Sequence, residues 1–97
     1  MARLSYAEAA LADLEYLTNF LVKSDPLAAA ETFSLIDEAI GILARHPLIG
    51  RSLGGELREL VISRGKSGYV ALYSFEPEAD AVLILGIRHQ REAGYWQ

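Results

Sequence analysis

Hydrophobic and polar positions in the first quarter of the chain alternate with the period of a helix. Four leucines recur at spacings of three and four residues: Leu11, Leu14, Leu17 and Leu21. Tyr16 and Phe20 widen this apolar stripe. Residues 5–8 (SYAE) have the form of a capping box, in which a serine and a glutamate satisfy free N–H groups at a helix start. The pattern predicts a short strand over residues 2–5 and then a helix that ends near Lys23.

A second helical stripe follows a break at Asp25 and Pro26. The aspartate can cap a helix, and the proline suits the first helical position, where its missing N–H costs nothing. The stripe consists of Phe33, Ile36, Ile40 and Leu43. Pro47 ends it, because a residue that precedes proline avoids helical backbone angles. Two helices with so short a break between them should pack antiparallel as a hairpin.

The second half of the chain reads as a loop and three strands. Residues 47–55 are rich in glycine and predict the loop, and strands are expected over residues 57–62, 69–75 and 81–89. The last strand is apolar on both faces, which is typical of a central strand covered on both sides. One face would take the helical hairpin, and the other calls for an external partner segment. We therefore expect one α+β domain over residues 1–97, with an N-terminal antiparallel helical hairpin packed on a small antiparallel β-sheet, in the order strand, helix, helix, strand, strand, strand.

Composition and charge limit the cellular setting and the kinds of site that the chain can form. Hydrophobic residues are 52% of the chain and cysteine is absent, which excludes disulfides and thiolate metal sites. No apolar run approaches the ~18 residues of a membrane span, and no secretory signal opens the sequence, so a cytoplasmic protein is expected. The net charge of −4 is uneven: residues 1–44 carry seven acidic and two basic side chains, and residues 45–97 carry six acidic and seven basic ones. Any nucleic acid contact would therefore use a local basic site.

Four segments of the chain, in order, resemble the RelE/ParE toxin superfamily, also called plasmid-stabilisation proteins. They are residues 46–51 (HPLIGR), 57–60 (LREL), 68–73 (GYVALY) and 87–92 (IRHQRE). The resemblance implies a helical hairpin on a sheet and neutralisation by a cognate antitoxin, ParD-like or similar, that alone contacts operator DNA. RelE-like members cleave messenger RNA on the ribosome, and several ParE-like members poison DNA gyrase. The last segment is more similar to the ParE side, which implies a non-enzymatic gyrase inhibitor without a cofactor.

The alternative of a RelE-like ribonuclease has its own candidate residues. RNA cleavage needs a proton acceptor, a proton donor and cations around the phosphate, and the catalytic candidates are Arg64, Lys66, Arg88, Arg91 and Tyr95. Against this reading, lysines are few and the chain is acidic. A third alternative is a family member that binds its antitoxin but has little toxicity.

Binding candidates are assigned with their structural alternatives. Target binding is expected at Arg51, Arg58, Arg88, His89 and Arg91, although Arg51 and Arg58 could instead pair with Glu56 and Glu59. Antitoxin binding is expected at Tyr16, Phe20, Tyr95 and Trp96. Two glutamate pairs, Glu8 with Glu15 and Glu31 with Glu38, should each share an exposed helix face. Each face is either an ordinary solvated surface or, if it binds the antitoxin, one that suits a basic segment. No metal site is expected, because the acidic turn at 76–80 lacks a calcium-loop pattern.

Overall fold

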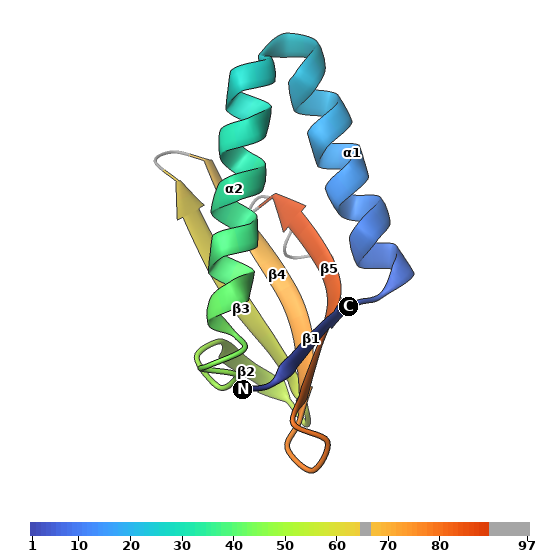
Figure 1. Ribbon diagram of the computed structural model, residues 1–97, viewed down its shortest axis with the longest axis vertical. Coiled ribbons are helices and arrows are strands. Elements are labelled where there is room, and N and C mark those ends of the chain that lie inside the picture. Colours follow the sequence, from blue (N-terminus) through green and yellow to red (C-terminus); the bar gives the residue numbers. More distant parts are fainter. Residues whose placement is uncertain (65–66, 90–97) are drawn as a thin grey trace.

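The computed structural model describes residues 1–64 and 67–89, with the side chains of residues 63, 64 and 67 left out. A helical hairpin lies against one face of a five-stranded sheet (Figure 1). The elements are β1 (Arg3–Tyr6), α1 (Glu8–Ser24), α2 (Pro26–Ile42), β2 (Arg51–Gly54), β3 (Leu57–Arg64), β4 (Ser67–Glu76) and β5 (Ala81–His89). The strands lie in the order β1-β5-β4-β3-β2. The α+β class and the helical hairpin on a sheet are as predicted from the sequence.

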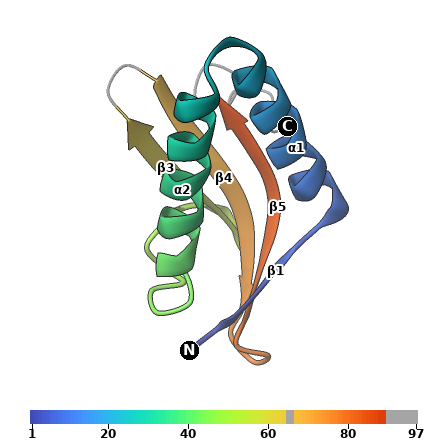
Figure 2. The same cartoon turned by 45° about the horizontal axis from the view of Figure 1, so that its top comes forward.

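The sheet is mixed rather than wholly antiparallel, which corrects one detail of the prediction. β2 to β5 pair antiparallel with their neighbours, but β1 pairs with β5 in parallel, from Arg3 opposite Ala81 to Tyr6 opposite Ile84. The two strands lie side by side in Figures 1 and 2. They are far apart in the sequence, so no tight turn forces an antiparallel arrangement on them.

A strand that the sequence did not predict lies within the expected 47–55 loop. β2 pairs antiparallel with β3, with Arg51 opposite Glu59. The turn between them needs Gly54 and Gly55, whose φ angles of 109° and 57° are in the region that favours glycine. The same glycines gave this segment the composition of a loop, so composition hid the strand. β3 and β4 also extend one or two residues beyond their predicted ends.

The predicted start of the second helix is confirmed, whereas that of the first is wrong. The Asp25 carboxylate accepts from the Ala28 N–H (3.2 Å), and Pro26 opens α2. The first helix has no side-chain cap: Ser5 lies in β1, and the N-cap is Ala7. Pairing with β5 overrides the capping box, because the Ala7 N–H donates to the carbonyl oxygen of Ile84 (2.8 Å).

The core lies between the hairpin and the sheet. Its largest fully buried side chains are Ile36, Ile40, Leu43, Tyr73, Val82, Ile84 and Ile87. Two predicted stripe residues, Leu11 and Phe33, are instead exposed. The buried side of α1 passes through Ala10, Leu14 and Leu17, which places Leu11 beside it. Within the described ranges, no helix has the length and apolar character needed to cross a membrane.

Candidate interaction surfaces

The loop after α2 is fixed to the sheet by a buried tyrosine. The Gly50 N–H donates to the Tyr73 hydroxyl oxygen (2.9 Å), and that hydroxyl donates to the Pro47 carbonyl oxygen (2.8 Å). Tyr73 lies on β4 and is fully buried. A Cβ atom at Gly50 would lie 2.5 Å from the Tyr73 hydroxyl oxygen and 2.9 Å from the Glu59 carbonyl oxygen, so only glycine fits this approach. No local pattern in the sequence predicted this anchoring role of Tyr73.

Arg58 fixes the same loop from β3. Its Nη1 donates to the carbonyl oxygens of Gly50 (2.7 Å) and Leu48 (3.2 Å). Arg58 was expected to bind a target or to pair with an acidic neighbour; within the toxin its guanidinium bonds backbone carbonyl oxygens, and target binding by Arg58 stays a prediction. Charge-assisted hydrogen bonds of this kind are about twice as strong as neutral ones. Arg58 and Tyr73 occupy opposing register positions on adjacent strands, which brings both anchors to one place.

Arg51 forms an ion pair with Glu59, one of the two partners considered from the sequence. Arg51 Nη2 lies 2.6 Å from Glu59 Oε1 across the β2–β3 ladder. The Arg51 side chain is 73% exposed and the Glu59 side chain only 7% exposed. The arginine therefore neutralises a buried carboxylate while most of its own surface still faces solvent.

Arg88 and His89 lie at the far end of β5, beside α1. Asp13 on α1 accepts from the Ile87 N–H (2.9 Å) and lies 4.0 Å from Arg88 Nε. This carboxylate satisfies a strand N–H at the outer edge of β5, beyond the four residues that pair with β1. His89 meets Tyr69 edge-on, with ring centroids 5.5 Å apart. The role of Asp13 was not foreseen, because its partner is 74 residues away in the sequence.

The described basic candidates do not converge on one site. Tyr73 opposes Arg58 on β3, and Val70 opposes Arg88 on β5. Side chains three positions apart on β4 point to opposite faces, so Arg58 and Arg88 lie on opposite faces of the sheet. The other candidates, Lys66, Arg91, Tyr95 and Trp96, lie outside the described residues, as does the side chain of Arg64.

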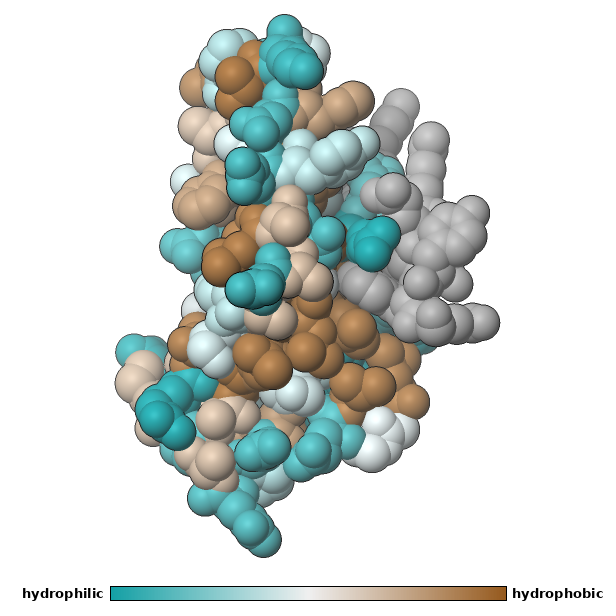
Figure 3. Space-filling view, turned by 90° about the vertical axis from the view of Figure 1, so that its right-hand side faces the viewer, coloured by the Kyte–Doolittle hydropathy of each residue, from teal (hydrophilic) through white to brown (hydrophobic). Residues whose placement is uncertain are grey.

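The helical hairpin presents exposed aromatic rings on an acidic background. Tyr16 is 67% and Phe20 63% exposed, and their rings stack with centroids 6.5 Å apart. From Glu8 to Ile42 the hairpin carries seven acidic side chains and one lysine. Figure 3, which faces the α1 side, shows hydrophobic and hydrophilic residues intermixed over the hairpin. The predicted exposure of the two glutamate pairs is confirmed.

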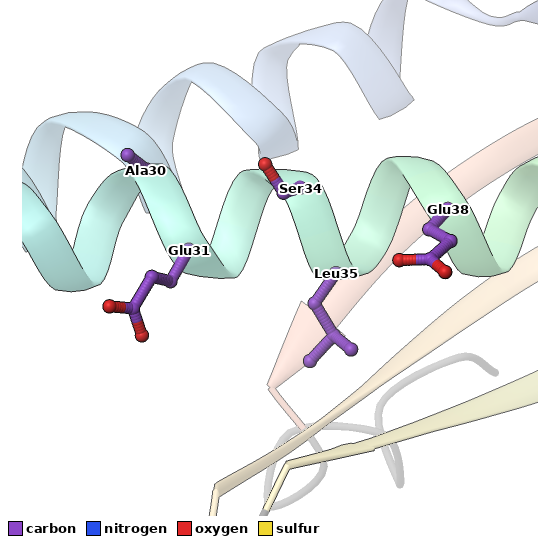
Figure 4. Close-up of a pocket in the computed structure, with 5 residues that line it drawn as sticks. All are labelled: Ala30, Glu31, Ser34, Leu35 and Glu38. Atoms are coloured by element: carbon purple, nitrogen blue, oxygen red, sulfur yellow. The ribbon is translucent and has the colours of Figure 1, made fainter.

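Two hollows lie on the hairpin. One, of about 410 Å³, is lined by residues of both helices: Thr18, Val22, Pro26, Ala29, Ala30, Phe33 and Ser34. The other, of about 420 Å³, lies along α2, where Glu31 and Glu38 flank Leu35 and all three side chains point to the same side (Figure 4). The α2 hollow, with Leu35 between two glutamates, suits a basic amphipathic segment better than a small anionic ligand, and the hollow between the helices has no acidic lining residue.

Burial raises the pKa of two tyrosines. For Tyr73, desolvation is the main cause, and it outweighs the opposing effects of the Gly50 hydrogen bond and of nearby Arg58. For Tyr6, desolvation again dominates, and the charge of Asp37 raises the pKa further. Both phenols are therefore held in their neutral form, which lets the Tyr73 hydroxyl donate to Pro47. Among the described residues, no group of three or more histidine, aspartate or glutamate side chains is placed to hold a metal ion.

Comparison with known proteins agrees with this architecture. The model of the family described as ParE toxin of type II toxin-antitoxin system, parDE, matches residues 4–94. Toxin RelE3 of Caulobacter vibrioides is 40% identical over 80 residues, which cover 82% of this chain and 85% of that toxin. The fold resembles the chromosomal ParDE system of P. aeruginosa, with a TM-score of 0.73, 24% identity, and coverage of 91% of this chain and 95% of that one. It also resembles the RelBE2 toxin-antitoxin complex of Mycobacterium tuberculosis, with a TM-score of 0.58, 28% identity, and coverage of 92% and 98%.

The fold and the match together define the class. The chain folds as a helical hairpin on a small mixed sheet, and the toxin family model matches nearly its whole length. This is the fold of a small protein toxin. The chain belongs to the ParE toxin family of type II toxin–antitoxin systems.

Proposed function

We propose that this toxin acts as a single domain in the cytoplasm, by binding a large cellular target without doing chemistry on it, and that DNA gyrase is the first target to test. One observation carries the proposal: the described basic candidates are used in holding the fold together. Arg58 binds backbone carbonyls, Arg51 pairs with Glu59, and Arg88 lies beside Asp13. Such arginines stabilise a binding scaffold and are not gathered around a scissile phosphate.

A ribonuclease of the RelE kind is the second candidate. The names of the relatives favour it, because both matched Caulobacter vibrioides proteins are called RelE toxins. In that case Arg88, Arg91 and Tyr95 would be the catalytic residues, with Arg64 and Lys66 as supporting cations. Substituting Tyr95→Phe separates the two readings, because it abolishes cleavage that uses the hydroxyl and leaves a binding toxin active.

We further propose that a cognate antitoxin neutralises the toxin by covering the hairpin, and that operator DNA is reached only through this antitoxin. The solved ParDE and RelBE relatives are toxin–antitoxin systems, which supports such a partner. Tyr16 and Phe20 supply large exposed rings, and the hollow between the helices supplies an apolar groove. The acidic surround calls for a basic, amphipathic antitoxin segment. An antitoxin whose toxin-binding segment is acidic would contradict this assignment.

Expression of the chain alone in a bacterium tests the mode of action. Growth, messenger RNA integrity and the DNA-damage response are followed together, with the Tyr95→Phe variant and antitoxin co-expression as controls. Growth arrest with a damage response, intact messages and full activity of Tyr95→Phe supports gyrase inhibition. Rapid message cleavage that Tyr95→Phe abolishes would make the chain a ribonuclease.

A further inference from the structure

A pair of exposed aliphatic side chains stands on the loop that follows α2. Leu48 is 59% and Ile49 56% exposed, and with His46 and Pro47 they line a shallow hollow of about 510 Å³. Scattered apolar residues on a surface are ordinary, but two adjacent large ones between a proline and a glycine form a local patch. Neither side chain belongs to the core cluster, so fold stability does not account for them.

The backbone beneath these two side chains is held unusually firmly for a loop. Tyr73 bonds Pro47 and Gly50, Arg58 bonds Leu48 and Gly50, and the Ile49 N–H donates to His46 (3.1 Å). A surface loop could satisfy these groups with water. Here a fully buried tyrosine and an arginine hold the loop backbone in one conformation. A recognition element that is ordered before binding loses less entropy when it binds.

The electrostatic setting of the loop is opposite to that of the hairpin. Residues 43–59 contain three arginines and two glutamates, one of which, Glu59, pairs with Arg51, so this segment has a net charge of +1. Glu8 to Ile42 contain seven acidic residues and one lysine. Arg45 and Arg51 flank the aliphatic pair in the sequence, and both are exposed. A partner complementary to the hairpin is basic, so it does not suit this loop.

We propose that Pro47–Ile49, here called the aliphatic knob, is a preformed contact for the toxin's target, and that its exposed side chains pack against an apolar patch edged by carboxylates on a protein surface. The assignment rests on the proposed function and adds to it where the target is engaged. A protein surface fits better than nucleic acid, because the knob offers aliphatic side chains and no aromatic ring for base stacking. Arg58 and Tyr73 are positioning residues that act through the knob.

The test compares the double variant Leu48→Ser/Ile49→Ser with a control, Leu27→Ser, which removes a leucine that is 70% exposed from the hairpin. Expression in a bacterium measures the toxin level needed for half-maximal growth arrest, and purified DNA gyrase serves as the binding probe. We expect the double variant to need about tenfold more toxin, as hot-spot residues do, and to bind the antitoxin encoded beside the toxin as before. Leu27→Ser should arrest growth like the wild type.

Each other outcome overturns the proposal in a recognisable way. If the wild type arrests growth and the double variant does so equally, the knob is not a target contact, while the proposed function stands. If the wild type leaves growth unchanged, the proposed function fails and this assignment fails with it. Loss of antitoxin binding in the double variant would give the surface to the antitoxin. Binding to total RNA is measured as well. If the wild type binds RNA and the double variant does not, the surface is a nucleic acid contact.

A double-mutant cycle tests whether Arg58 acts through the knob. Arg58→Ala should raise the arresting toxin level in the wild-type background and change it less than about twofold in the Leu48→Ser/Ile49→Ser background. Equal effects in both backgrounds would show that Arg58 only supports the fold.

Discussion

The helical hairpin and the loop that follows it are adjacent in the sequence and differ in almost every physical respect. The hairpin is acidic, and its exposed rings, Tyr16 and Phe20, stand on helices that extend past the sheet (Figure 1). The loop is short and basic, and Pro47, Leu48 and Gly50 are hydrogen-bonded to Tyr73 or Arg58 on the sheet, while the Ile49 N–H donates within the loop to His46. The difference supports the proposal that one small domain offers two surfaces of opposite charge, the hairpin to the antitoxin and the loop to the target.

The largest effect is expected where the loop meets the sheet. Gly50→Ala would place a methyl group 2.5 Å from the Tyr73 hydroxyl oxygen and 2.7 Å from its Cε1, so loop or ring must move. We expect the free energy of unfolding to fall by about 3 kcal/mol, measured by urea denaturation. Gly41→Ala is the matched control: it lies in α2, where an added Cβ meets no atom within 4 Å, and it should stabilise by about 0.5–1 kcal/mol. Equal stability of the two variants would show that the loop is loosely held.

The hairpin should behave in the opposite way, with little effect on stability and a large one on binding. Tyr16→Ala/Phe20→Ala removes two exposed rings, so the free energy of unfolding should change by less than about 0.5 kcal/mol per site. Antitoxin binding should weaken by about 2 kcal/mol, measured by calorimetry, because aromatic anchors dominate protein interfaces. The exposed Leu57→Ala variant, on β3, is the control and should bind normally. Unchanged antitoxin affinity in the double variant would remove the hairpin from the interface.

Tyr73→Phe tests the hydrogen bonds to the loop separately from the packing of the buried ring. It keeps the buried ring and removes both hydrogen bonds to the loop, which leaves the Gly50 N–H and the Pro47 carbonyl without this partner. We expect a loss of about 1.5 kcal/mol in unfolding free energy and faster hydrogen exchange at the Gly50 amide. The hairpin amides should exchange as before. Faster exchange across the whole chain would mean that the hydroxyl stabilises the fold at large and not this loop.

The smallest effect is a dependence of stability on alkaline pH. The pKa values of Tyr73 and Tyr6 are raised above their ordinary value of 10.0, mainly by burial, so the folded state favours the protonated phenols. The stability that they contribute is complete below about pH 10 and is lost as the pH rises through the raised folded values. Urea midpoints from pH 8 upward should therefore fall above pH 10, and the fall should be shallower in Tyr73→Phe. The exposed Tyr16→Phe variant should follow the wild type.

The features that were predictable from the sequence are those fixed by neighbouring residues. Asp25 and Pro26 predict the start of α2, because a capping hydrogen bond joins residues only three positions apart. The continuous apolar run of β5 likewise predicts both ends of that strand. β2 was missed because its pairing with β3, and not its own composition, makes it a strand. The capping box at Ser5 failed for the same reason, since β5 takes up this segment as a strand.

The site was less predictable than the fold because its contacts span long distances in the sequence. Tyr73 lies 26 residues from Pro47, and Asp13 lies 74 residues from Ile87, so no local pattern links the members of either pair. The local signals for the loop were Pro47 and its glycines, which do not reveal the distant side chains that hold it. Arginines looked alike in the sequence, and only the structure separates Arg58, which holds backbone, from Arg51, which pairs with Glu59.

The most direct test of the two-surface account is hydroxyl-radical footprinting of the toxin, free and in complex with its antitoxin, read out by mass spectrometry. This method reports side-chain exposure. It can therefore detect a partner on Leu48 and Ile49 even though the backbone of their loop is already hydrogen-bonded in the free toxin. We predict that Tyr16 and Phe20 become protected in the complex while Leu48 and Ile49 stay as reactive as in the free toxin. Protection of Leu48 and Ile49 with reactive Tyr16 and Phe20 would contradict it, because the antitoxin would then occupy the surface assigned to the target.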